Sequence, residues 1–81
     1  MSHATKIVVN LEEVEVHQDK LTYAQLVHIA YPRDPPADVS DLIYTITISH
    51  PSFGDISLAR GDKPVAVKPG MVCHVRKTGR S

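Results

Sequence analysis

The end of the sequence holds the residues whose types and order could take part in chemistry. An apolar run, Met71 to Val75, passes directly into the polar residues 76–81, which include Gly79. Glycine lacks a Cβ, so the walls of an active site can close on the backbone around a carbonyl that is cleaved or activated. This order suits a C-terminal segment that enters the active site of another protein. The competing interpretation is fraying, because the ends of most small domains are poorly ordered.

The composition describes one small domain without a strong electrostatic preference. Its 81 residues allow a single core, and a formal net charge of zero argues against nucleic acid or an anionic membrane as the main partner. No apolar run approaches the roughly 20 residues that span a bilayer. Cys73 is the only cysteine, which excludes an intramolecular disulfide, and no charged-then-apolar leader opens the chain. We therefore expect a reducing, cytoplasmic location.

The other reactive residue types form no recognisable catalytic or metal-binding pattern. None of the five histidines pair at the i, i+4 spacing of a helical metal site. No nucleophile stands in a recognisable elbow, and there is no glycine-rich phosphate loop. Alternation along the last strand turns Cys73 toward the core, where it acts as a small buried hydrophobe. We expect no catalytic residues and no bound metal or cofactor, so the protein is a substrate of enzymes and not an enzyme.

The N-terminal segment predicts a β-hairpin. Residues 5–9 are largely β-branched, and residues 13–17 alternate between charged or polar and apolar side chains. Asn10 can supply the turn between the two strands, although Leu11 stands where a glycine would be usual.

A helix over residues 22–31 is indicated by its start signals. Thr22 is a favourable N-cap, and Gln25 three residues later completes a capping box. Leu21 and Leu26 occupy the two positions of a hydrophobic staple. The expected buried face contains Tyr23, Leu26, Val27 and Ala30. The proline- and acid-rich residues 33–41 that follow predict an exposed loop.

The second half of the sequence predicts strands over residues 42–49, 55–58 and 71–76, with an isolated apolar triplet at 65–67. The helix must cross one face of a sheet, and the apolar last strand fits best in the centre beside the first. This arrangement is an α+β fold, a β-grasp with a mixed four- to five-stranded sheet and one helix. The main alternative, a split β-α-β layout, needs a second helix that the pattern does not show.

Several of these segments resemble a known family. They are Tyr44–Thr47, the turn from Leu58 to Gly61, Val65–Met71, the ending 75–81 and the helix segment Leu26–Pro32. From Val8 onward the chain resembles the prokaryotic multiubiquitin-type domains. The resemblance implies a bacterial ubiquitin-like modifier, similar to those encoded beside activating-enzyme-like, conjugating-enzyme-like and metallopeptidase-like proteins.

The resemblance also implies a use for the C-terminal segment. An activating enzyme would use ATP to adenylate a C-terminal glycine, and a thioester or oxyester would carry it to a target amine or hydroxyl. The sequence departs from ubiquitin because Gly79 stands alone, so a peptidase must first remove Arg80 and Ser81. We expect a ubiquitin-like domain over residues 1–76, a flexible tail over residues 77–81, and a monomer before conjugation.

A docking surface for these partners is predicted on the outer sheet face. The third strand is apolar on both faces, which suggests that its second face is covered part of the time. The predicted partner-binding residues are Ile43, Thr45, His74 and Arg76, followed by Lys77 and Thr78. The alternative function is a non-conjugated β-grasp binding module that uses this face or an exposed strand edge.

Overall fold

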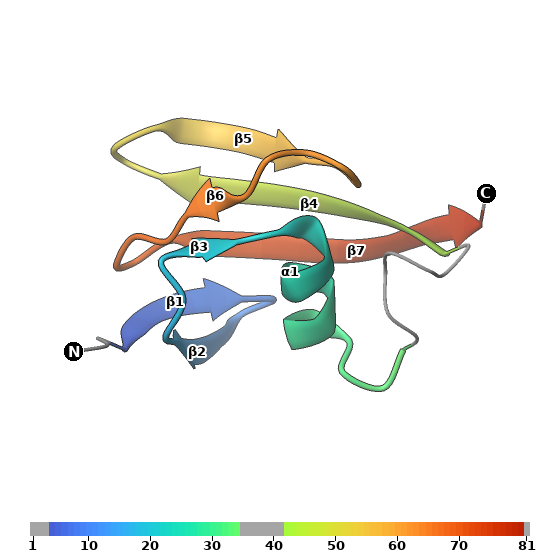
Figure 1. Cartoon of the computed structure of the whole chain (residues 1–81), viewed down its shortest axis with the longest axis horizontal. Coiled ribbons are helices and arrows are strands. Elements are labelled where there is room, and N and C mark those ends of the chain that lie inside the picture. The colour runs from blue at the N-terminus through green and yellow to red at the C-terminus, as the bar shows by residue number, and fades with distance from the viewer. Residues whose placement is uncertain (1–3, 35–41, 81) are drawn as a thin grey trace.

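The structure is a computed structural model that describes residues 4–34 and 42–80. In chain order its elements are β1 (Thr5–Val9), β2 (Glu12–Val16), β3 (Lys20–Leu21), α1 (Tyr23–Ala30), β4 (Leu42–His50), β5 (Gly54–Leu58), β6 (Val65–Ala66) and β7 (Val72–Arg80). Figure 1 shows them coloured from blue at the N-terminus to red at the C-terminus.

The main sheet has the strand order β2-β1-β7-β4-β5. The first and last strands, β1 and β7, run parallel in its middle, and the other neighbours are antiparallel. The short strands β3 and β6 form a separate pair. The helix α1 lies across one face of the sheet (Figure 1). This is the β-grasp arrangement that the sequence predicted.

The helix begins at the predicted capping box. The Gln25 N–H donates to Thr22 Oγ1 at 3.2 Å, and the Thr22 N–H donates to Gln25 Oε1 at 2.9 Å. Leu21 and Leu26, the predicted staple residues, are both fully buried. The helix ends where the Tyr31 N–H donates to the carbonyl oxygen of Val27. Local signals therefore fix where α1 begins, and the burial of Leu21 and Leu26 packs it against the sheet.

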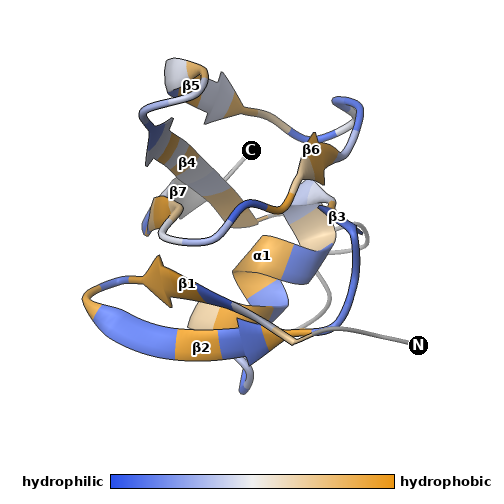
Figure 2. Cartoon of the chain, turned by 90° about the vertical axis from the view of Figure 1, so that its left-hand side faces the viewer, coloured by the Kyte–Doolittle hydropathy of each residue, from blue (hydrophilic) through white to orange (hydrophobic). Residues whose placement is uncertain are grey.

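The core lies between α1 and the sheet. Figure 2 shows that hydrophobic residues occur on the strands and on α1, the elements that enclose this space. The fully or almost fully buried side chains are Ile7, Val9, Val16, Leu21, Tyr23, Leu26, Val27, Tyr44, Ile46, Ile48, Leu58, Met71, Cys73 and Val75. The predicted alternation of the third strand and of the last strand is confirmed.

The β1–β2 turn has an unusual second residue. Asn10 and Leu11 both have positive φ, 51° and 70°, as the two-residue turn between paired strands requires. Asparagine tolerates this conformation, whereas leucine pays a steric penalty there. The Leu11 side chain remains 86% exposed. The turn prediction at Asn10 is confirmed.

The last strand is longer than predicted. The prediction that it ends at Arg76 is wrong, because β7 continues to Arg80. The added residues pair with the start of β4: Lys77 lies opposite Tyr44, Gly79 opposite Ile43 and Arg80 opposite Leu42. A register shift between Ile43 and Tyr44 leaves Thr78 without a directly opposed residue. The start of β4 offers a strand edge to this segment, and pairing satisfies backbone groups that would otherwise need water.

Two other predictions concern residues that lie partly outside the described ranges 4–34 and 42–80. The predicted exposed loop over residues 33–41 lies largely outside the described residues, as does Ser81. That residues 77–81 move as a flexible tail stays a prediction. No helix in the described part of the chain has the length and apolar character to cross a membrane.

Candidate functional site

The outer sheet face carries the predicted docking residues of β4 and β7. Thr45 pairs with Arg76, and Thr47 pairs with His74. Because strand side chains alternate and Ile46 and Val75 point into the core, these four point away from α1. Thr45, His74 and Arg76 are exposed, and Ile43 at the start of β4 is 41% exposed. The structure therefore brings the predicted face together.

Thr78 supports the shift in register between the two strands. Its Oγ1 donates to the carbonyl oxygen of Ile43 at 3.1 Å, and its side chain is exposed. Arg60, in the loop after β5, donates from Nη2 to the carbonyl oxygen of Leu42 at 2.8 Å. Side chains from β7 and from the loop after β5 thus bind carbonyl groups of the first two residues of β4, which helps to keep them in place as the partner of β7.

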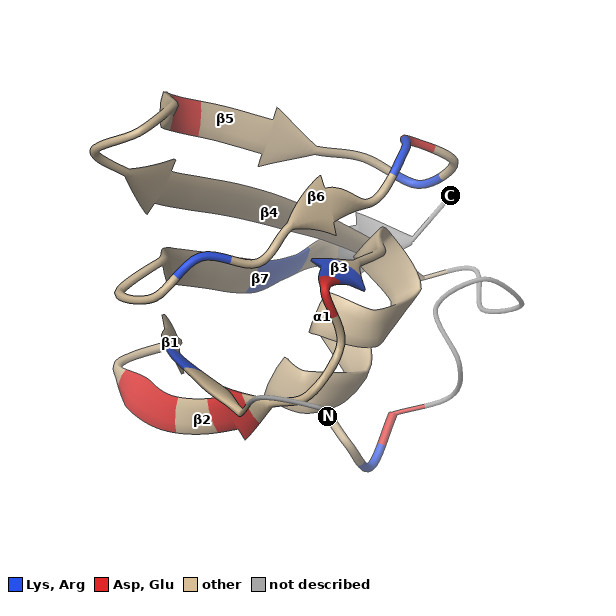
Figure 3. Cartoon of the chain, turned by 60° about the vertical axis from the view of Figure 1, so that its left-hand side comes forward, with Lys and Arg blue, Asp and Glu red and all other residues tan. Residues whose placement is uncertain are grey.

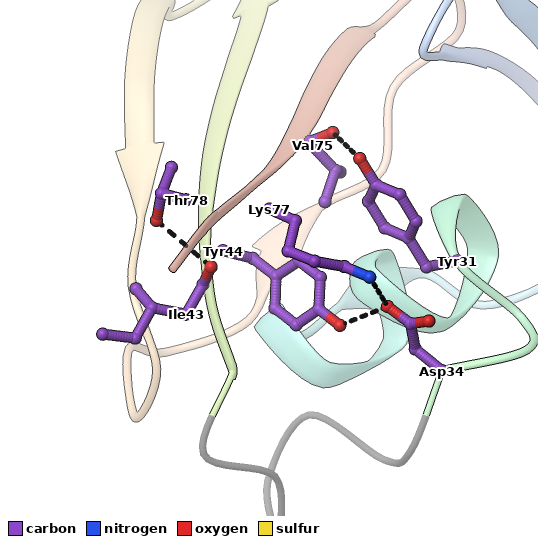
Figure 4. A network of polar contacts seen from close by, with 7 residues as sticks. All are labelled: Tyr31, Asp34, Ile43, Tyr44, Val75, Lys77 and Thr78. Carbon is purple, nitrogen blue, oxygen red and sulfur yellow. Dashed lines mark hydrogen bonds and ion pairs between the residues drawn. The ribbon is translucent and has the colours of Figure 1, made fainter. Parts of the chain in front are cut away.

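Lys77 lies on the opposite face from Arg76, beside the end of α1. Its Nζ is 2.8 Å from Asp34 Oδ2 and lies 5.3 Å from the centre of the Tyr31 ring. The Tyr44 hydroxyl donates to the same Asp34 oxygen at 2.6 Å. Figure 4 shows these side chains meeting beneath β7. We call Tyr31, Asp34, Tyr44 and Lys77 the anchor cluster.

The anchor cluster alters the proton affinity of two of its members. The hydrogen bond from Lys77, with a second from Tyr44, lowers the pKa of Asp34 below its ordinary value of 3.8. Burial, together with the hydrogen bond to Asp34, raises the pKa of Tyr44 to about 12. Asp34 is therefore a carboxylate and Tyr44 a neutral donor at neutral pH.

Val75 is a second attachment point of β7. The Tyr31 hydroxyl donates to its carbonyl oxygen at 3.3 Å, and Asn10 Nδ2 donates to the same oxygen at 3.0 Å. The Val75 N–H in turn donates to Asn10 Oδ1 at 2.8 Å. The Asn10 carboxamide therefore continues the β1–β7 ladder for one more residue. Figure 4 shows the tyrosine contact.

The sequence comparison identifies the family. A match to the multiubiquitin family covers residues 5–78. The chain belongs to the multiubiquitin family. No curated protein and no solved structure shows significant similarity to the chain.

In this multiubiquitin-family domain, the candidate reactive residue lies in a strand. Gly79 pairs with Ile43 and is followed by Arg80 opposite Leu42, at the end of the molecule where β4 begins (Figure 1). The predicted site residues Gly79 and Arg80 are thus close to Ile43, whereas Lys77 is turned to the other face. The sequence analysis missed the anchor cluster, although Tyr31 at the helix end was a signal for it.

Three other features of the multiubiquitin-family domain bear on its chemistry. Cys73 is fully buried, and burial raises its thiol pKa to about 11, which disfavours the nucleophilic thiolate. Among residues 4–34 and 42–80 no three metal-ligating side chains gather in one place. Acidic residues colour much of β2, and basic residues lie on β7 (Figure 3).

Proposed function

We propose that this multiubiquitin-family domain is a bacterial ubiquitin-like protein modifier. In this proposal a metallopeptidase-like enzyme cleaves after Gly79, and the new carboxylate is transferred to target amines or hydroxyls. Support comes from the family match over residues 5–78. The position of Gly79 at the end of β7, beyond the helix-covered core, gives further support.

The proposed reaction uses Gly79 as a substrate and no catalytic residue of the domain. Its carboxylate oxygen attacks the α-phosphate of ATP on an activating enzyme and releases pyrophosphate. An enzyme thiol or hydroxyl then attacks the acyl-adenylate and displaces AMP, which gives a thioester or oxyester. A target nucleophile finally displaces that enzyme group. Glycine suits these steps because enzyme walls can approach its carbonyl closely.

The outer sheet face is the proposed docking surface for these enzymes. Arg76 and His74 give it hydrogen-bond donors beside the exposed part of Ile43. Arginine is enriched at protein interfaces. The face lies on the same strands as Gly79, so an enzyme bound there is close to the reactive residue.

Intact-mass spectrometry of a reconstituted reaction tests the proposal. The domain is incubated with ATP, its cognate peptidase, its activating enzyme and its conjugating enzyme. We expect a truncated species that ends at Gly79 and an ATP-dependent adduct formed from it. Gly79→Pro should impair adduct formation, whereas Ser81→Ala changes only a residue that is removed and should have no effect. Equal adduct formation by Gly79→Pro and the unmodified chain would contradict transfer through Gly79.

A second candidate is supported by the strand pairing of Gly79. A non-conjugated binding module has no need for a free terminus, and here Gly79 pairs with Ile43 without a neighbouring glycine. This function predicts that the domain captures a partner through the outer sheet face, while the reconstituted reaction yields no ATP-dependent adduct.

A further inference from the structure

The two halves of β7 differ in how many neighbours hold them. Residues 72–75 have β4 on one side and β1 or the Asn10 carboxamide on the other. From Lys77 onward, strand pairing within residues 4–34 and 42–80 involves β4 alone. We call Lys77–Arg80 the distal segment. Its pairing is that of an edge strand, which opens more easily than a strand paired on both sides.

The anchor cluster contacts the distal segment through a side chain, in addition to its strand pairing with β4. Lys77, the first residue of the distal segment, binds Asp34 at 2.8 Å and lies over the Tyr31 ring. Asp34 is itself fixed by the Tyr44 hydroxyl at 2.6 Å, and Tyr44 is 4% exposed. The ion pair therefore joins the distal segment to a buried side chain and to the end of α1 (Figure 4).

We propose that the anchor cluster is a latch that holds the distal segment against β4, and that this latch must open before an enzyme can act on the Gly79 carbonyl. The role in enzyme access rests on the proposed function. The physical reason is competition for the same backbone, because an active site that binds an extended chain by strand pairing needs backbone groups that β4 now occupies. The latch is an autoinhibitory contact within the fold.

The solvent exposure of the Lys77–Asp34 ion pair indicates that the latch is weak enough to open. The side chains of Lys77 and Asp34 are 40% and 21% exposed. Ion pairs in contact with water contribute only modestly to stability. The latch therefore lowers the open population a few-fold without locking the segment. An enzyme that binds the released distal segment as an extended strand would shift this equilibrium toward the open state.

Amide hydrogen exchange of the isolated domain tests the latch. Asp34→Asn keeps the shape of the side chain and an acceptor for Tyr44 but removes the charge that binds Lys77. We expect the amides of the distal segment to exchange about 3- to 5-fold faster in this variant. Amides of β1 and of the first half of β7 exchange through larger openings, so they should stay better protected than the distal segment in both proteins and accelerate by no more than the loss of global stability. Asp55→Asn is the matched control, since Asp55 accepts a hydrogen bond from Ser49 at the other end of β4.

A second variant removes the other partner of the ion pair. Lys77→Met keeps an unbranched apolar chain over Tyr31 and should also accelerate exchange of the distal segment. Lys63→Met, in the exposed loop between β5 and β6, is its control. Unchanged exchange at residues 77–80 in both cluster variants would overturn the latch. Exchange of residues 77–80 as slow as that of β1 in the unmodified domain would also overturn it, because the distal segment would then open only with the whole fold.

The exchange result is independent of the proposed function, because it requires no enzyme. When both hold, Asp34→Asn is also cleaved after Gly79 faster than the unmodified chain by the cognate peptidase. Faster exchange without any cleavage or adduct supports the latch and contradicts the modifier function. Cleavage at an unchanged rate, despite faster exchange, contradicts the role of the latch in access.

Discussion

At the scale of single residues, Asp34 has the most informative chemistry. Its carboxylate binds both the Lys77 ammonium and the Tyr44 hydroxyl, so that folding favours the ionised form. The lowered pKa means that this contribution is fully present above the unfolded pKa of about 3.8. It is lost as the pH falls through the lower pKa of the folded state.

This sign leads to a prediction for Asp34→Asn. At pH 7 the variant should be less stable than the unmodified domain, and the difference should shrink as the pH falls below about 3.8. Urea unfolding curves at pH 7, 4 and 2.5 measure it. A difference in unfolding free energy that stays constant across this range would show that the charge of Asp34 does not contribute.

Cys73 should be chemically inert in the folded domain. Its side chain is fully buried and its thiol pKa is raised to about 11 by burial. Iodoacetamide at pH 8 should therefore alkylate the native thiol at least about 100-fold more slowly than the thiol of the urea-unfolded chain, because reaction requires opening. Mass spectrometry follows the reaction. Comparable rates would mean that the centre of β7 is accessible in the native state.

At the scale of elements, α1 is the part of the core that a single substitution tests best. Leu26 is fully buried against the sheet. Leu26→Ala should lower the free energy of unfolding by about 2 to 5 kcal/mol, as truncation of buried leucines does. His28→Ala on the exposed side of the same helix should change it by less than about 0.5 kcal/mol. A loss below about 1 kcal/mol for Leu26→Ala in a denaturant melt would contradict the packing described above.

The elements also show what the sequence could and could not predict. The helix was predictable because its capping box and staple involve residues within five positions of each other. The end of β7 was not, because its partner residues Leu42 and Ile43 lie more than thirty positions earlier. Because β7 extends past Arg76, its side chains continue to alternate from the buried Val75, and Lys77 therefore points toward α1.

The candidate site was predictable to a similar extent. Placing Thr45, His74 and Arg76 on one face required only the period of two along each strand and the central position of the last strand. Asn10 could be recognised as a turn residue, but its two bonds to Val75 depend on how far β1 and β7 overlap. The contacts of Asp34 could not be predicted for the same reason. They depend on where the chain after α1 lies relative to Lys77 and Tyr44 in the folded domain.

At the scale of the whole molecule, the two faces of the sheet carry different residues. The face toward α1 holds the core and the anchor cluster, while the outer face presents Arg76 and His74. With a formal net charge of zero, the domain as a whole lacks a strong steering field. In the proposed function, recognition by enzymes therefore depends on the local chemistry of the outer face.

Arg76→Glu should separate recognition from stability. The substitution reverses the charge of an exposed side chain on the proposed docking face, so capture of the proposed activating enzyme should weaken about tenfold or more while the melting temperature stays nearly unchanged. Pull-down titration and a thermal melt measure the two effects. Lys63→Glu makes the same charge change in a distant loop and should leave capture intact. Unfolding of Arg76→Glu would assign Arg76 a structural role.

The most direct test of the modifier function is the residue through which the domain is linked to targets in cells. Trypsin cuts after Lys77, so transfer through Gly79 would leave a Thr78–Gly79 remnant on target side chains. The account predicts this dipeptide in tandem mass spectra of digested conjugates. A remnant of Ser81 alone would show transfer without trimming, and conjugate-free digests from cells that express the cognate enzymes would contradict the modifier function itself.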